Sequence, residues 1–243
     1  MATISSGQPM HKVQLQPGYI LHHRPYRDTS LLLEIFTPEQ GRLGLVARGA
    51  RGPRSRSRGL LQPFQPLLLS WSGRADLGTL HAVEAGGAAR PLRGTALYSG
   101  FYLNELLMRL LQRQDPHPEL YLAYGAALEG LQSESQRPLR LFEKRLLEAL
   151  GYGLLLDQEA TGAPLDSAAE YLYELESGPV RSTGASGGGL RLAGRSLLSL
   201  AAEDLSDAQS LSDAKQLMRA ALGLYLGERG LKTREIFAAI AGR

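Results

Sequence analysis

The sequence contains no cysteine. Disulfides, zinc sites built from cysteine and thiol nucleophiles are therefore all excluded. A chain of 243 residues does not depend on such crosslinks, because chains above roughly 150 residues bury about two-thirds of the surface that their unfolded form exposes. The composition fits a protein that folds in a reducing compartment.

Long apolar runs are also missing. No segment approaches the roughly 20 apolar residues that span a bilayer. The opening MATISSGQPMHK lacks the apolar core of a secretory leader. We expect a cytoplasmic protein with no membrane partner and a flexible start over residues 1–12.

Common catalytic motifs are scarce as well. Neither HExxH nor GxxxxGK[ST] occurs. His22 and His23 would point to opposite faces of a strand, which makes them a poor metal pair, and His117 lies where a helix is expected to start. We expect neither an enzyme nor a bound metal or cofactor.

What the chain does have is an uneven charge. Residues 1–80 contain ten Lys and Arg against four Asp and Glu, whereas the remainder contains 17 against 20. A basic first part joined to a mildly acidic remainder suggests that the first part meets a polyanion. Chance clustering of ordinary surface charge is the alternative.

The first part of the chain contains short apolar stretches separated by turn residues. They lie at Ile20, Ser30–Phe36, Leu43–Val46, Leu60–Trp71 and Leu77–Glu84. Pro63 and Pro66 make the start of the fourth stretch irregular. Five short strands over residues 13–86 predict a closed barrel of the OB type.

Beyond Gly86 the apolar residues recur at three- and four-residue spacing, which predicts helices. The expected helices lie near Leu97–Leu111, Pro118–Leu131 and Leu139–Leu150, the last closed by Gly151. A later helix, capped by Asp207 or Ser212, ends at Leu226, and Thr233 caps a final one. The fold class is therefore α+β and multidomain, with a helical domain over residues 87–151 and 196–243.

Residues 152–195 interrupt that helical domain and read as an irregular insertion. Tyr171–Glu176 alternates apolar and polar residues as a strand does, and Gly184–Gly189 reads as a flexible loop.

The densest local signal is RGARGPRSRSRG at Arg48–Gly59, with five arginines in eleven residues and no acid among them. Gly, Pro and Ser keep this segment out of helices and strands, and guanidinium groups pair bidentately with phosphate. Tyr26 is the aromatic residue best placed to stack on a base, whereas Phe36 is expected in the core. The predicted nucleic-acid interface comprises Arg24, Tyr26, Arg27, Arg42, Arg48, Arg51, Arg54, Arg56, Arg58 and Arg74. A solvated loop without a partner is the alternative.

Several segments, in their order and spacing, resemble the family of the recombination mediator RecO. They are LHHRPYRDTSL at 21–31, FTPEQGR at 36–42, LVARGAR at 45–51, LQPFQPL at 61–67, LYSGFYLNELL at 97–107, LGYG at 150–153, YLG at 225–227 and LKTRE at 231–235. The resemblance covers about residues 13 to 240.

The resemblance implies an amino-terminal OB-fold, a helical domain and, in many members, a small zinc ribbon. It implies binding of single- and double-stranded DNA, annealing of complementary strands, contacts with RecR and with single-stranded DNA-binding protein, and indirect help to RecA. Because this sequence has no cysteine, residues 152–195 are expected to be a metal-free remnant of the ribbon. Such a protein would be associated with the nucleoid.

The acidic, apolar tail of single-stranded DNA-binding protein, a partner implied only by the resemblance, needs basic side chains around an apolar notch. Arg140 and Lys144 lie four residues apart, on one face of the expected helix, beside Leu141. We predict that the tail docks there. The alternative is that both cations merely solubilise an amphipathic helix.

Two other classes of function stay open. An OB-fold RNA-binding protein of the translation apparatus would need the same arginines and the same barrel, and some enzymes carry an OB-fold as one module. Equal binding of DNA and RNA without annealing would favour the first class.

Overall fold

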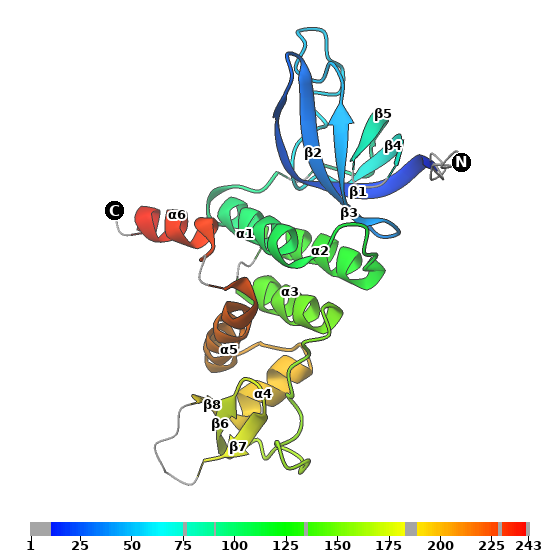
Figure 1. Cartoon of the computed structure of the whole chain (residues 1–243). Helices are drawn as coiled ribbons and strands as arrows, with labels where there is room; N and C mark the ends of the chain where they lie inside the picture. The colour runs from blue at the N-terminus through cyan, green and yellow to red at the C-terminus, as the bar shows by residue number, and fades with distance from the viewer. Residues whose placement is uncertain are drawn as a thin grey trace, which may run out of the picture. The chain divides into compact units, whose positions relative to one another are not determined.

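The computed structural model describes residues 11–74, 77–89, 91–133, 136–182, 189–227 and 230–241 (Figure 1). The chain forms two compact units. The first contains the residues up to Arg93 together with Leu103–Gly125, and the second contains Gly94–Tyr102 and Ala126–Arg243. Helix α1 (Gly94–Leu110) contributes residues to both.

A closed five-stranded barrel forms most of the first unit, as predicted. Its strands are β1 (His11–Tyr26), β2 (Ser30–Thr37), β3 (Gly41–Ala47), β4 (Leu67–Arg74) and β5 (Leu77–Ala85). They pair in the order β1-β2-β3-β5-β4, and β4 closes on β1. Among the described strands of this barrel, the β3–β5 pair alone is parallel.

Strand β1 is much longer than the expected stretch at Ile20. Its first half pairs with β4 and its second half with β2, and a register shift between Ile20 and His22 separates neighbouring parts of the β2 ladder. His11 and Lys12, expected in a flexible start, already belong to this strand, while residues 1–10 lie outside the described part of the chain.

Alternation along the strands builds the barrel core, because successive side chains point to opposite faces. The buried residues at every second position are Leu31, Leu33 and Ile35 on β2, Leu43, Leu45 and Ala47 on β3, and Leu67, Leu69 and Trp71 on β4. Each large side chain buried in this way stabilises the fold by roughly 1.5–3 kcal/mol.

A second layer of the first unit packs against the barrel through aromatic side chains. Phe36 is fully buried, as predicted, and its ring centre lies 5.6 Å from that of Tyr121 on α2 (Pro118–Gly130). Asn104 on α1 donates from Nδ2 to the carbonyl of Leu21 at 2.7 Å and accepts a hydrogen bond from the Tyr124 hydroxyl. These buried bonds fix α2 and the second half of α1 to the barrel.

Four further helices lie in the described residues of the second unit. They are α3 (Gln136–Ala149), α4 (Gly194–Ala201), α5 (Ala208–Leu226) and α6 (Lys232–Ala241). Gly151 ends α3 with a φ of +81°, and Tyr152 N donates to Leu147 O at 2.8 Å, so the predicted glycine cap is confirmed. Asp207 caps α5 by accepting from Ser210 N at 2.9 Å, which leaves no capping role to Ser212. Thr233 lies inside α6 and does not cap it.

The insertion is more regular than expected. Strands β6 (Glu170–Glu174), β7 (Gly178–Arg181) and β8 (Leu190–Ala193) form an antiparallel sheet in the order β7-β6-β8. Tyr171, Tyr173 and Leu192 are buried on its inner face. The described residues of the expected glycine loop begin at Gly189, since Gly184–Gly188 lie outside them. No helix in the described part of the chain combines the length and apolarity that crossing a bilayer requires.

Candidate nucleic-acid interface

The arginine loop, Arg48–Gly59, follows directly after β3 and is held in place by its neighbours. Ala50 within it and Leu61 just beyond it are buried in the barrel core. Its backbone forms successive turns, with Gly52 N donating to Gly49 O at 3.0 Å and Ser55 N to Gly52 O at 3.1 Å. The loop is therefore anchored, and all five of its arginines are exposed.

The turn between β1 and β2 is joined to this loop by Arg51. Its backbone N donates to Thr29 O at 2.8 Å, and its Nη1 donates to Arg27 O at 3.3 Å. Arg27 has a φ of +50°, a conformation that costs energy in any residue other than glycine. The Arg27 guanidinium lies 5.3 Å from the ring centre of Tyr26. Arg51 thus positions Arg27 and Tyr26 beside the loop.

Most of the predicted interface comes together in this way at one end of the barrel, away from α2 in Figure 1. Arg24 is exposed and shares a face of β1 with half-buried Tyr26, because side chains two apart on a strand point the same way. The backbone of Arg74 pairs with Leu77 at the start of β5, but its side chain lies outside the described part of the structure. The described side chains that are exposed at this arginine end of the barrel are Arg24, Arg27, Arg48, Arg51, Arg54, Arg56 and Arg58.

Arg42 does not lie with this group, which disfavours its predicted role at the interface. It lies at the other end of β3, roughly 20 Å away at about 3.3 Å per residue, and its Nη1 donates to the carbonyl of Met108 on α1. Burial lowers the pKa of its guanidinium, although nearby Glu34 opposes the shift. Gln114 N also donates to Arg42 O at 2.9 Å. Arg42 therefore joins the barrel to the segment between α1 and α2 within the first unit.

We expect Arg42→Ala to act on stability and not on nucleic-acid binding. Loss of its charged hydrogen bond should lower the free energy of unfolding by about 1.5–3 kcal/mol, while affinity for an oligonucleotide stays within about twofold. Arg48→Ala, at the other end of the same strand, is the matched control and should do the reverse. Urea unfolding and fluorescence anisotropy of both variants measure the two effects, and a fall in affinity for Arg42→Ala at unchanged stability would return it to the interface.

The predicted docking site on α3 is also disfavoured, because its two cations are not on an open face. The Arg140 side chain is 7% exposed, and its Nη1 lies 3.0 Å from Oε2 of fully buried Glu143. Lys144 Nζ lies 2.9 Å from both Glu148 Oε1 and Glu203 Oε1, and Leu141 is half-buried. Burial alone would raise the pKa of Glu203, but hydrogen bonds from Lys144 and Arg145 lower it overall. Arg140 and Lys144 are thus committed to internal partners.

Around Glu143 these contacts form a buried polar cluster that the sequence did not reveal. Its other oxygen, Oε1, accepts a hydrogen bond from the Tyr102 hydroxyl on α1. That hydroxyl in turn accepts from Arg234 Nη2 on α6 at 3.2 Å. Burial raises the pKa of Glu143 despite the attraction of Arg140. The cluster links three helices of the second unit.

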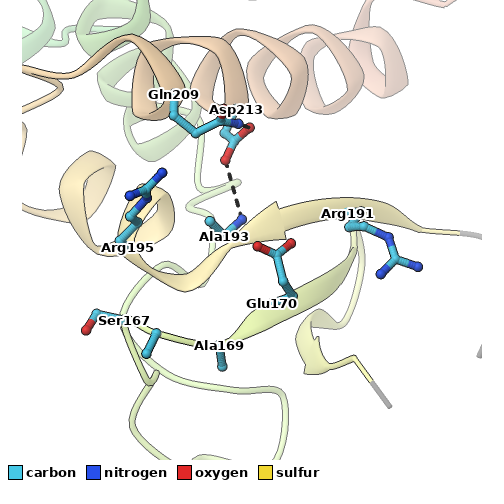
Figure 2. A pocket seen from close by; sticks show the side chains of 9 residues that line it. Ser167, Ala169, Glu170, Arg191, Ala193, Arg195, Gln209 and Asp213 are labelled. Atoms are coloured by element: carbon cyan, nitrogen blue, oxygen red, sulfur yellow. Dashed lines mark hydrogen bonds between the residues drawn. The ribbon is translucent and has the colours of Figure 1, made fainter. Parts of the chain in front are cut away.

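The second unit also has a hollow of about 510 Å³ between β6, β8 and α5 (Figure 2). Glu170 and Asp213 contribute carboxylates to it, and Arg191 and Arg195 contribute guanidinium groups. Asp213 is already occupied, because its Oδ1 accepts from Gln209 Nε2 at 2.7 Å. With both signs of charge around it, this hollow offers a polyanion no field of one sign. Among the described residues, no group of three or more His, Asp or Glu side chains could hold a metal ion.

Comparison with known proteins identifies the family. The sequence-family model for the Recombination protein O N-terminal domain matches residues 10–87, and the family model for its C-terminal domain matches residues 92–235. This chain belongs to the RecO family. DNA repair protein RecO of Alkalilimnicola ehrlichii is 51% identical over 232 residues, which cover 95% of this chain and 93% of that protein.

Two further relatives show that the similarity to RecO proteins extends over most of the chain. DNA repair protein RecO of Nitrosococcus oceani is 50% identical over 226 residues, or 92% of either chain. The protein of the same name from Haemophilus influenzae is 45% identical over 227 residues, which cover 92% of this chain and 95% of that protein. The RecO similarity therefore includes both the barrel and the helical part, and the barrel is the OB-fold domain of the family.

Proposed function

We propose that this RecO protein is a mediator of DNA repair and homologous recombination that binds single- and double-stranded DNA at the arginine end of its barrel. It anneals complementary strands, including strands coated with single-stranded DNA-binding protein. With RecR it helps to load RecA. A location on the nucleoid belongs to the same proposal.

The observation that supports this function best is the array of seven exposed arginines that the structure describes at one end of an OB barrel. Guanidinium groups on a loop and an adjoining turn can each meet a phosphate of any sequence, since phosphate contacts position a strand without reading its bases. The anchored turns of the loop hold these cations outward before a strand arrives, which reduces the entropy lost on binding.

The proposed action is binding and not covalent chemistry. Strand pairing needs two strands brought together with their charges screened, and the arginine end supplies that screening. Annealing should therefore proceed without magnesium and without cleavage. Docking of the tail of single-stranded DNA-binding protein on the helical part stays within the proposal. Arg140 and Lys144 are disfavoured as the residues that the tail contacts first, because both side chains are buried.

A fluorescence annealing assay tests this function. Two complementary strands carrying a donor and an acceptor dye are coated with single-stranded DNA-binding protein and mixed with the full chain in the presence of a metal chelator. We expect the pairing rate to rise with protein concentration and the strands to stay intact. Equal binding of RNA and DNA with no gain in pairing rate would overturn the proposal and favour an RNA-binding role. Strand cleavage would indicate an enzyme.

A further inference from the structure

A hollow of about 550 Å³ opens at the arginine end of the barrel, between the β1–β2 turn, the end of β3 and the start of β5. Its volume lies within the roughly 300–1,000 Å³ that small-ligand sites occupy. The residues that matter for its chemistry are Tyr26, Arg27, Arg48, Val46, Leu77 and Thr79. They combine cations, an aromatic ring, apolar side chains and a hydroxyl in one depression.

The apolar wall of the hollow is not explained by phosphate binding. Leu77 is 47% exposed, although it lies among arginines that favour a strongly hydrated surface. It begins β5 and pairs with Gly44 of β3, two residues before Val46, which pairs with Thr79. Phosphates need only the cations, whereas an apolar wall beside them suits the flat face of a nucleobase.

Two side chains at the edge of the hollow are already placed to contact a nucleobase. Tyr26 and Arg27 lie together, with the guanidinium 5.3 Å from the ring centre, and both aromatic rings and guanidinium planes stack on unpaired bases. Arg51 fixes this pair through its bonds to Arg27 O and Thr29 O. Gly49 also lines the hollow and has a φ of +67°, and a Cβ built there would meet nothing within 4 Å. A side chain therefore has room at Gly49.

We propose that this hollow takes one unpaired nucleotide, with its base against Leu77 and Val46 and its phosphates on Arg27 and Arg48. A base inside a duplex cannot enter, because its faces are stacked and unpairing it costs free energy. Single strands then bind through a base and phosphates, and duplexes through phosphates alone. The hollow thereby makes the interface prefer single strands. This inference rests on the proposed function, since it specifies how the same interface holds DNA.

Two variants test this inference, one by removing an apolar side chain and the other by adding a side chain. Leu77→Ala removes the exposed side chain of the apolar wall, and Gly49→Asn adds a side chain at a lining position with a residue that tolerates the left-handed conformation. Affinity is measured by fluorescence anisotropy for a short single strand, for the same strand with abasic positions, and for the matching duplex, all at one salt concentration. We expect each variant to lose about tenfold in affinity for the normal single strand, the scale of one stacked base, and to stay within about twofold for the abasic strand and the duplex.

Leu15→Ala is the matched control, because Leu15 is 50% exposed on β1 and does not line the hollow. It should leave all three affinities unchanged. Equal losses for single strand, abasic strand and duplex in the two test variants, or no loss in any, would overturn the proposal. Should the unaltered protein bind neither single strand nor duplex, the proposed function itself fails, and that outcome is distinct from a failure of the hollow to read a base.

Discussion

Replacing Arg54, Arg56 and Arg58 together by alanine will weaken single-strand binding by roughly 100-fold at about 0.1 M salt and by little near 1 M. Each phosphate contact contributes about 0.7 to the slope of log affinity against log salt on a single strand, so three contacts contribute about 2. All three side chains are exposed on the arginine loop, whereas the residues that anchor this loop, Ala50 and Leu61, are buried in the core. The barrel should therefore fold normally while its binding declines.

The matched control removes three exposed arginines from the second unit, Arg191, Arg195 and Arg219, and so changes the net charge by the same amount. Titrations from 50 mM to 1 M salt, on two strands of different sequence, compare the slopes. The loop variant should lose affinity equally on both sequences, because phosphate contacts carry no sequence information. If both triple variants flatten the slope to the same degree, binding depends on overall charge and not on this loop.

Arg51 is left out of that variant because its role differs from that of the other loop arginines. The sequence gives no reason to separate it, since it stands in the same arginine-rich run. Its hydrogen bond to Arg27 O joins positions that lie 24 residues apart. The antiparallel pairing of β2 with β3, which sets Leu31 opposite Ala47, brings the β1–β2 turn next to the end of β3. The pattern of residue types within the loop does not show that contact.

The barrel itself was predictable because its strands are half-buried and alternate. Leu31, Leu33 and Ile35 recur at every second position of β2, which is the period of a strand with one face in the core. The insertion was harder to predict, since β7 and β8 contain four residues each and their period is too short to recognise. Only Tyr171–Glu176 was long enough to indicate the strand that became β6.

Arg42 and Arg140 show a different limit. We expected both charges on the surface, because Lys and Arg are almost never fully buried unless paired. The partner of Arg42, the Met108 carbonyl, is distant in the sequence, and the spacing of Arg140 and Glu143 does not show that this pair is buried. Spacing correctly placed Arg140 and Lys144 on one face of α3. It could not show that this face meets other parts of the second unit, where Glu203, 59 residues after Lys144, supplies the neutralising carboxylate. Which face of a helix is buried depends on contacts that are distant in the sequence.

Arg140→Ala should therefore destabilise the protein more than Arg42→Ala or Arg145→Ala does. It leaves the fully buried carboxylate of Glu143 without its guanidinium partner, which lies 3.0 Å away in the intact protein. Breaking a buried ion pair in this way costs about 3–5 kcal/mol of unfolding free energy. Arg145→Ala, which removes a 49% exposed neighbour on the same helix, is the control and should cost less than about 1 kcal/mol. Urea unfolding at pH 7.5 compares the two.

The deficit of Arg140→Ala should shrink as the solution is acidified. Burial raises the pKa of Glu143 above its value in the unfolded chain, and Arg140 opposes that shift, so removing Arg140 raises the folded-state pKa further. A carboxyl group with a raised pKa stabilises the folded state at low pH, and this stability is lost as the pH rises through the folded-state pKa. Lowering the pH from 7.5 to 5 should therefore return part of the lost stability to the variant, measured against the unaltered protein so that other titrating groups cancel.

The double variant Arg140→Met with Glu143→Leu separates the charge from the packing. It removes both members of the pair and should be more stable at pH 7.5 than Arg140→Ala alone, because no buried charge is left without a partner. Its deficit should not shrink on acidification, because the carboxyl group whose protonation returns stability to Arg140→Ala is gone. A deficit of Arg140→Ala that is independent of pH, or one no larger than that of Arg145→Ala, would show that Glu143 is not held as a buried charge. Arg140 would then be available to bind the tail of single-stranded DNA-binding protein.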